Sequence, residues 1–200
     1  MTFKVKDHYF KKAKQDNYLA RSIYKLEEIN EKYSIISKGD NVLDLGYYPG
    51  SWMQYTTQIV GPEGFVVGID IKEVNQKLEI IPNARVYQKD INDLKDISEL
   101  GVDEKFDVLV SDMAPNTTGI KSVDQARSMQ LVEMVYYHLP MLLKEGGNFC
   151  IKIFDSHEAQ QFIKDRRKKD FKSVHLLKPK STRSVSKEFF LIGKGFLNNA

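Results

Sequence analysis

The fold of this chain is decided by the stretch Asn41-Val42-Leu43-Asp44-Leu45-Gly46-Tyr47-Tyr48-Pro49-Gly50-Ser51-Trp52. Its first five residues are mostly apolar, as in a strand that is covered on both sides, and a glycine-bearing turn then leads into a helix. Such a turn places backbone N–H groups at the start of a helix, where a nucleotide-like ligand can bind. The stretch lacks the spacing G-x-G-x-x-G, so it does not by itself indicate a dinucleotide site.

Short apolar runs alternate with longer amphipathic stretches along the rest of the chain. This alternation predicts an α/β fold of the Rossmann-like type: a mainly parallel, seven-stranded sheet with one antiparallel hairpin at its edge and helices on both faces. The clearest helix is predicted over 123–143 and is closed by Gly146-Gly147. The strands are predicted over 41–45, 65–70, 85–87, 106–110, 148–154, 173–177 and 188–192.

One further helix is predicted ahead of the sheet, over 18–33, because Leu19, Ile23, Leu26 and Ile29 recur at helical spacing. Arg21 and Lys25, four residues apart, would share another face of this helix. Residues 1–17 are expected to form a basic segment without regular periodicity, and the core is expected over 40–195. With 200 residues, we predict a single domain over 1–200.

Composition narrows the class of protein. Hydrophobic residues make up 42% of the chain, as in ordinary globular proteins. No apolar run is long enough to cross a membrane and the chain does not open on a signal-peptide stretch, so we expect a cytoplasmic protein with no membrane partner; an organelle version stays open. Cys150 is the only cysteine, which excludes an internal disulfide and, without Cys or His neighbours at ligand spacing, a metal site.

The net charge of +3 conceals an uneven distribution. Residues 1–25 hold seven Lys or Arg against two Asp, residues 164–187 hold ten against two, and the segment between them is acidic. Two basic ends favour a surface that binds a polyanion. A single charge run is more often a solvated face, and only the presence of two runs brings the two interpretations level.

Carboxylates end three of the predicted strands: Asp70, Asp90 and Asp112. Because the carboxyl ends of parallel strands share one edge of a sheet, these acids should meet the turn at Gly46. Asp70 could accept hydrogen bonds from a ribose diol, although any one acid can also serve as a cap for the next segment. The sequence holds no P-loop lysine, H-E-x-x-H or G-x-S-x-G, which argues against a phosphate cradle, a zinc hydrolase and a serine acyltransferase.

Lys152 interrupts the apolar run 149–154 near the carboxyl end of its strand. Two interpretations stay open from the local sequence. Either the strand lies at a sheet edge and the lysine reaches outward to solvent, or burial and a second cation lower the pKa of its amine and make it a usable general base.

Five motifs in order resemble the FtsJ/RrmJ family of RNA ribose 2′-O-methyltransferases: R-S-I-Y-K-L (21–26), D-L-G-Y-Y-P-G-S-W (44–52), S-D-M-A-P-N (111–116), I-K-I-F (151–154) and K-P-K-S-T-R-S-V-S-K-E-F-F (178–190). The resemblance extends from about residue 8 to 195. It implies the S-adenosylmethionine-dependent methyltransferase fold, S-adenosylmethionine as methyl donor with S-adenosylhomocysteine as product, and no metal requirement. It departs from the family at Tyr47 and Tyr48, where small residues are usual, and at 155–157, which lacks the usual Gln-Gly.

The resemblance also implies roles for single residues. Lys25, Asp112, Lys152 and Glu188 match the family's catalytic tetrad. Of these, Lys152 is expected to be the general base, Lys25 its electrostatic partner, and the two acids the groups that orient them. The donor is expected to contact Gly46, Gly50, Trp52, Asp70, Asp90 and Asp112.

The expected acceptor is RNA, namely a uridine of the large-subunit ribosomal RNA, held by a chain that acts as a monomer. The sequence Asp112-Met113-Ala114-Pro115 departs from the motif of enzymes that methylate base nitrogens, which agrees with a ribose hydroxyl. A tRNA substrate and a non-catalytic RNA-binding protein stay open as alternatives. If the two ends meet at the active site, they form a track for the RNA backbone: Lys11, Lys12, Lys14, Arg21, Lys178, Lys180, Arg183 and Lys187.

Overall fold

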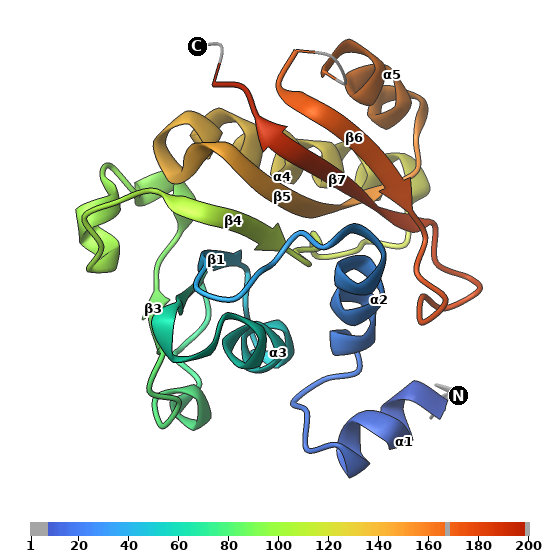
Figure 1. The fold of residues 1–200 in the computed structure, drawn as a ribbon. Helices are drawn as coiled ribbons and strands as arrows, with labels where there is room; N and C mark the ends of the chain where they lie inside the picture. Colours follow the sequence, from blue (N-terminus) through green and yellow to red (C-terminus); the bar gives the residue numbers. More distant parts are fainter. Residues whose placement is uncertain (1–7, 167–168, 199–200) are drawn as a thin grey trace.

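The computed structural model describes residues 8–166 and 169–198. Its seven strands form one sheet in the order β3-β2-β1-β4-β5-β7-β6 (Figure 1). The strands are β1 (Asn41–Leu45), β2 (Phe65–Asp70), β3 (Ala84–Gln88), β4 (Phe106–Ser111), β5 (Leu143–Phe154), β6 (Phe171–Leu177) and β7 (Glu188–Phe196). The α-helices are α1 (His8–Gln15), α2 (Ile23–Tyr33), α3 (Ser51–Val60), α4 (Lys121–Leu142) and α5 (His157–Arg166).

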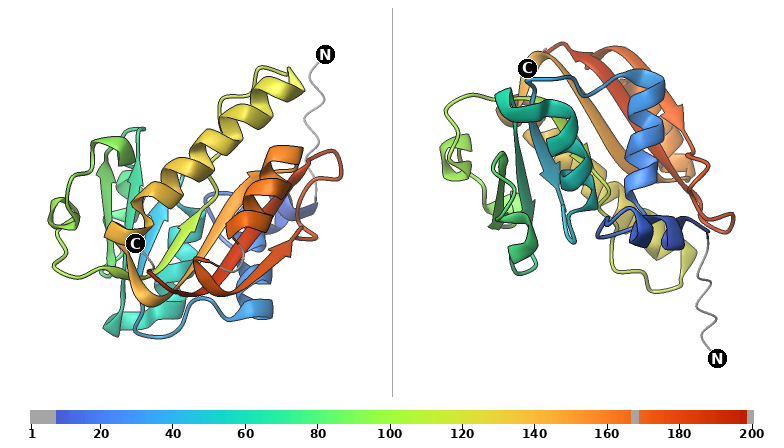
Figure 2. Two further views of the ribbon diagram at one scale, coloured as in Figure 1. Left: turned by 90° about the horizontal axis from the view of Figure 1, so that it is seen from above. Right: turned by 60° about the horizontal axis from the view of Figure 1, so that its bottom comes forward.

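Helices cover both faces of the sheet, as predicted (Figure 2). On one face, Ile23 of α2 and Met53 of α3 belong to the same apolar cluster as Val110 and Cys150 of the strands. On the other face, residues of α4 and α5 pack against the intervening strand residues, such as Ile151. Successive strand side chains point to opposite faces, which explains why the strands are apolar at nearly every position.

The predicted antiparallel hairpin is confirmed, but its second strand does not form the edge. β7 pairs antiparallel with β5 on one side and with β6 on the other, so β6 is the edge strand. The insertion of β7 brings its first residue, Glu188, opposite Phe154 at the end of β5.

The N-terminal helix begins five residues later than predicted. Asn17 adopts a left-handed conformation (φ 58°), and the Leu19 N–H donates to the Gln54 side chain of α3 instead of to a helical carbonyl. Arg21 therefore lies in a turn ahead of α2 and does not share a face of that helix with Lys25. Within the expected basic segment 1–17, residues 8–15 form α1, while residues 1–7 lie outside the described part of the chain.

The predicted helix 123–143 is confirmed with bounds shifted by one or two residues, but Gly146-Gly147 does not close it. The chain enters β5 directly at Leu143, and both glycines lie within that strand. Gly146 has a φ of 80° and lies within a register shift between β4 and β5, where Phe106 pairs with Leu143 but Val108 pairs with Asn148. None of the helices in the described ranges is long and apolar enough to cross a membrane.

Candidate active site at the carboxyl edge of the sheet

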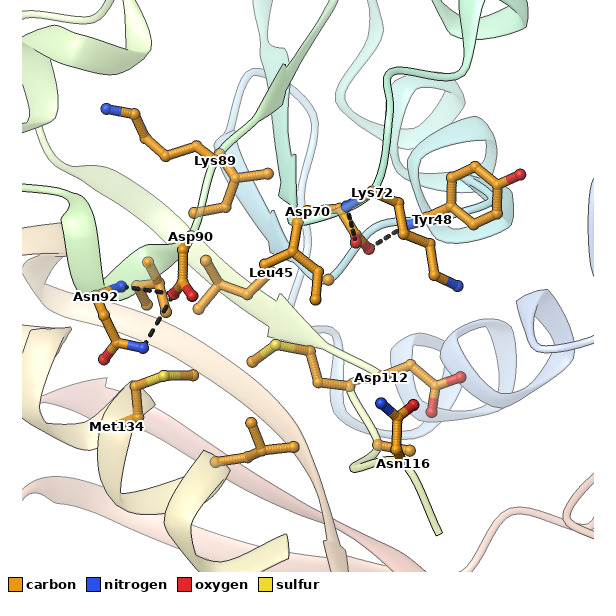
Figure 3. Close-up of a pocket in the computed structure, with 17 residues that line it drawn as sticks. Leu45, Tyr48, Asp70, Lys72, Lys89, Asp90, Asn92, Asp112, Asn116 and Met134 are labelled. Carbon is orange, nitrogen blue, oxygen red and sulfur yellow. Dashed lines mark hydrogen bonds between the residues drawn. The ribbon is translucent and has the colours of Figure 1, made fainter. Parts of the chain in front are cut away.

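A cavity of about 410 Å³ lies at the carboxyl ends of β1, β2 and β4 (Figure 3). The strand order reverses between β1 and β4, which is where open α/β sheets bind their ligands. Polar side chains from the ends of β2 and β3 and from the loop after β4 line the cavity, together with apolar side chains of that loop and of α4. Its size is within the range of small-molecule sites. The cavity is lined, among others, by Gly46, Asp70, Asp90, Asp112, Met113, Leu131 and Met134.

The turn after β1 requires glycine at two positions. Gly46 has a φ of 72°, and a Cβ atom there would collide with the Met113 side chain. Gly50 has a φ of 111° at the start of α3, and a Cβ atom there would collide with Leu78. Gly46 lines the cavity, whereas Gly50 is buried behind it and shapes the turn.

Trp52 does not line the large cavity. Its indole N–H donates to the Ser22 carbonyl at 2.8 Å, and its ring packs against Phe190, so it ties α3 to the start of α2 and to β7. Trp52 instead lines a small polar cavity of about 40 Å³, together with Asp44 and Asp112.

Asp70 and Asp90 each accept hydrogen bonds from nearby backbone N–H groups, and both also line the large cavity. Asp70 accepts from the N–H of Lys72 through Oδ1 and from the N–H of Tyr48 through Oδ2. Asp90 accepts from the backbone and side-chain amides of Asn92 through Oδ1 (Figure 3). The interpretation of these acids as caps is confirmed, and both also line the cavity; their contact with the donor stays a prediction.

Asp44 is a site residue that sequence reasoning missed. It is 2% exposed, and its Oδ2 has no hydrogen-bond partner among the described residues. Burial raises the pKa of this carboxyl well above its usual range, and the negative charges of Asp112 and Asp70 raise it further. The available signal was an acid inside an apolar strand, the same kind of anomaly that singled out Lys152.

The four tetrad residues come together from four separate elements. Lys25 of α2 lies 2.6 Å from Glu188 Oε1 at the start of β7 and 3.4 Å from Asp112 Oδ1 after β4. Lys152 of β5 lies 3.0 Å from the same Asp112 oxygen, and its ammonium also donates to the Asp112 backbone carbonyl. The exposed fractions of these side chains are only 7% to 19%.

The interpretation of Lys152 as an outward-reaching edge lysine is wrong. β5 lies between β4 and β7, and the Lys152 side chain is 7% exposed. Because residues 150 and 152 point to the same face, the amine faces α2 and meets Lys25 across Asp112. Asp112 lines both the large and the small cavity, so the cluster stands at their common edge.

The two unusual tyrosines lie apart. Tyr47 is 3% exposed, its ring lies against Gly68, and its hydroxyl accepts from the N–H of Asn75 at 3.3 Å. Tyr48 is 44% exposed and lines the rim of the large cavity. Neither ring closes the cavity.

Part of the predicted basic track is assembled. The Arg21 guanidinium donates to the Ser181 carbonyl, and the N–H of Lys180 donates to Glu28 of α2. Burial lowers the pKa of Arg21, and the positive charge of Arg183 lowers it further.

The remaining lysines of the predicted track make local contacts or are exposed. Lys12 lies over the Tyr24 ring at 4.3 Å, and Lys178 donates to the Ser186 carbonyl. The other predicted positions, Lys11, Lys14 and Lys187, are exposed. No group of three or more metal-ligating side chains occurs in the ranges that the structure covers.

Comparisons with known proteins match most of the chain to one family. Residues 18–196 match the model of the family described as FtsJ-like methyltransferase. A Bdellovibrio bacteriovorus protein named ribosomal RNA large subunit methyltransferase E is 47% identical over 96% of this chain and 98% of its own length.

Two solved structures share the fold. A Plasmodium falciparum protein assigned as a ribosomal RNA methyltransferase superposes with a TM-score of 0.78 at 30% identity, covering 90% of this chain and 99% of that one. Fibrillarin from Aeropyrum pernix, solved with S-adenosyl-L-methionine, has a TM-score of 0.56 at 16% identity, covering 80% of this chain and 68% of that one; at this identity it shows the fold alone.

Proposed function

The chain belongs to the FtsJ-like methyltransferase family, and from this premise we propose that it methylates a ribose 2′-hydroxyl of RNA, with S-adenosylmethionine as donor and a uridine of large-subunit ribosomal RNA as target. The observation that carries the proposal is the convergence of Lys25 and Lys152 on one carboxylate, Asp112, at the edge of the cavity. A ribose hydroxyl is a weak acid, so an enzyme that methylates it benefits from a positioned base.

The cavity fits the donor. Asp70 and Asp90 offer carboxylate oxygens at the ends of β2 and β3, where ribose and base would lie, and Met113, Leu131 and Met134 offer an apolar wall. The carboxylates of Asp70, Asp90 and Asp112 at the edge favour a ligand that carries positive charge. S-adenosylmethionine supplies a methyl group on a positively charged sulfur when it is bound.

The tetrad residues act on the acceptor. To act as the base, Lys152 must be in its neutral amine form, in which it accepts the proton of the 2′-hydroxyl; Asp112 fixes its Nζ through a carboxylate oxygen and a backbone carbonyl. Lys25 remains an ammonium between Asp112 and Glu188, and its charge stabilises the oxygen that loses its proton. Holding the hydroxyl in line contributes to the rate in addition to proton removal.

The proposed RNA surface runs along the two basic ends. Contact between the turn at Arg21 and the loop 178–187 brings positive charge beside the tetrad. Phosphate contacts make binding fall steeply with salt. A binding constant that hardly changes between low and moderate salt would exclude this track.

The ribosomal target rests on the name of the Bdellovibrio relative, and no contact in the site favours tRNA. A non-catalytic RNA-binding protein is disfavoured because neither Tyr47 nor Tyr48 fills the cavity. Action as a monomer in the cytoplasm stays a prediction.

The proposal is tested by methyl transfer from radiolabelled S-adenosylmethionine to three acceptors: large ribosomal subunits from a strain that lacks this gene, free ribosomal RNA and tRNA. A 2′-O-methyl group blocks alkaline cleavage of the adjoining phosphodiester, so the label should remain in an alkali-resistant dinucleotide. Label released in mononucleotides would indicate base methylation and overturn the ribose assignment. Absence of donor binding in calorimetry would favour the non-catalytic alternative.

A further inference from the structure

A second hollow adjoins the large cavity on the side of Tyr48. It is a groove of about 880 Å³ that is lined by Tyr48, Ile71, Lys72, Asn75, Lys77 and Gln88, among others. Three residues, Tyr48, Ile71 and Lys72, line both the groove and the large cavity. Tyr48 also lines the small polar cavity that contains Asp112. This side chain therefore stands where the donor cavity, the tetrad and the groove meet.

Tyr48 is held by its backbone while its ring remains accessible. The N–H of Tyr48 donates to Asp70 at 3.0 Å, and the neighbouring Tyr47 is fixed in the core. Tyr48 is 44% exposed, and its ring points away from the interior of the large cavity (Figure 3). The Lys72 ammonium lies 4.7 Å from the ring centroid, over one face. Proteins that bind single-stranded nucleic acids use this arrangement: a base stacks on an aromatic ring whose position is already fixed, and a cation lies beside that ring.

We propose that Tyr48 is a positioning residue that stacks on a nucleobase next to the target nucleotide, with Lys72 and Lys77 facing the adjoining phosphates. The inference rests on the proposed function, because it takes RNA as the substrate. Because the ring points away from the interior of the donor cavity and also lines the groove, its partner would stack on the groove side. The lysine pair outnumbers the one acid of the groove, Glu73, which suits a phosphodiester chain.

The test compares Tyr48→Ala, Tyr48→Phe and a matched control, Tyr137→Ala. Tyr137 is 82% exposed on α4 and is not among the residues that line the cavities described above. The probes are a fluorescein-labelled single-stranded RNA of about 12 nucleotides at low salt, and the same RNA with abasic sugars. Steady-state methylation of large ribosomal subunits gives KM and kcat, and calorimetry gives donor affinity.

We expect Tyr48→Ala to weaken binding of the RNA about tenfold, in line with the loss of one base–aromatic stack. The KM for the RNA substrate should rise by a similar factor, with kcat and donor affinity within about twofold of wild type. Tyr48→Phe and Tyr137→Ala should bind like wild type. Abasic RNA should bind wild type and Tyr48→Ala alike, because it has no base to stack.

Two results would overturn the role of Tyr48 and leave the proposed function intact. In the first, Tyr48→Ala binds RNA as wild type does and methylation persists. In the second, Tyr48→Ala loses donor affinity and keeps RNA affinity. The second result would mean that the ring covers the donor. A wild-type protein that neither binds nor methylates RNA would instead overturn the proposed function, and the inference with it.

Discussion

Replacing Lys152 tests the assignment of the general base. Lys152→Met keeps an unbranched side chain of similar length in a site that is 7% exposed, and it removes the amine. General-base catalysis contributes about 100- to 10,000-fold, which corresponds to about 2.7 to 5.5 kcal/mol in the barrier. We expect kcat to fall by this range. Donor affinity should change little, because Lys152 is not among the residues that line the large cavity.

Lys152→Arg separates proton transfer from charge. A guanidinium keeps the positive charge beside Asp112, but it does not deprotonate in proteins and cannot act as a base. The arginine variant should therefore lose as much turnover as the methionine variant. Near wild-type turnover in Lys152→Arg would refute the base assignment and leave Lys152 an electrostatic role.

Stability must be measured beside activity. In Lys152→Met, Asp112 loses its nearer cation but keeps Lys25 at 3.4 Å, so we expect destabilisation of about 1 to 3 kcal/mol. Lys194→Met is the matched control, because Lys194 is a partly buried lysine of β7 that donates to the Tyr33 carbonyl at the end of the strand away from Glu188. It should lose stability to a similar degree and retain turnover. Equal losses of turnover in both variants would assign the effect to folding.

Three other substitutions probe the rest of the site. Lys25→Met should lower kcat about a hundredfold in methyl-transfer assays, because it removes the charge that stabilises the deprotonated oxygen; unchanged kcat would exclude that role. Asp44 has a raised pKa in the folded state, so the wild type loses stability as pH rises from the ordinary carboxyl range to that higher value. Asp44→Asn cannot ionise, so its melting temperature should exceed that of the wild type at pH 8 but not at pH 4. The same difference in melting temperature at both pH values would contradict this. Gly46→Ala should lower the free energy of unfolding in urea by about 1 to 3 kcal/mol more than Gly39→Ala, and it should weaken donor binding. Both glycines have a positive φ, but only at Gly46 would a Cβ atom collide with Met113. Equal losses of stability in the two variants would contradict the collision with Met113.

The alternation of strands and helices, the glycine turn after β1 and the acids at the strand ends could all be predicted from the sequence. These features are local: they depend on apolar periodicity, on which residues tolerate a turn and on the residue types at the end of each strand. The anomalous Lys152 was also visible, because an unpaired ammonium in a buried strand is costly wherever the strand lies. The ordered motifs predicted the tetrad, whose members lie together in the structure.

Only the tertiary structure decided the features that depend on neighbours distant in sequence. The insertion of β7 between β5 and β6 brings Glu188 to Lys25, and the contact of Leu19 with Gln54 sets where the chain ahead of α2 runs. The different positions of Tyr47 and Tyr48 also depend on distant neighbours, because the two residues are of the same type and adjacent in the sequence. One packs over Gly68 and the other faces the groove, because the space on each side of the turn is set by strands and loops that fold against it.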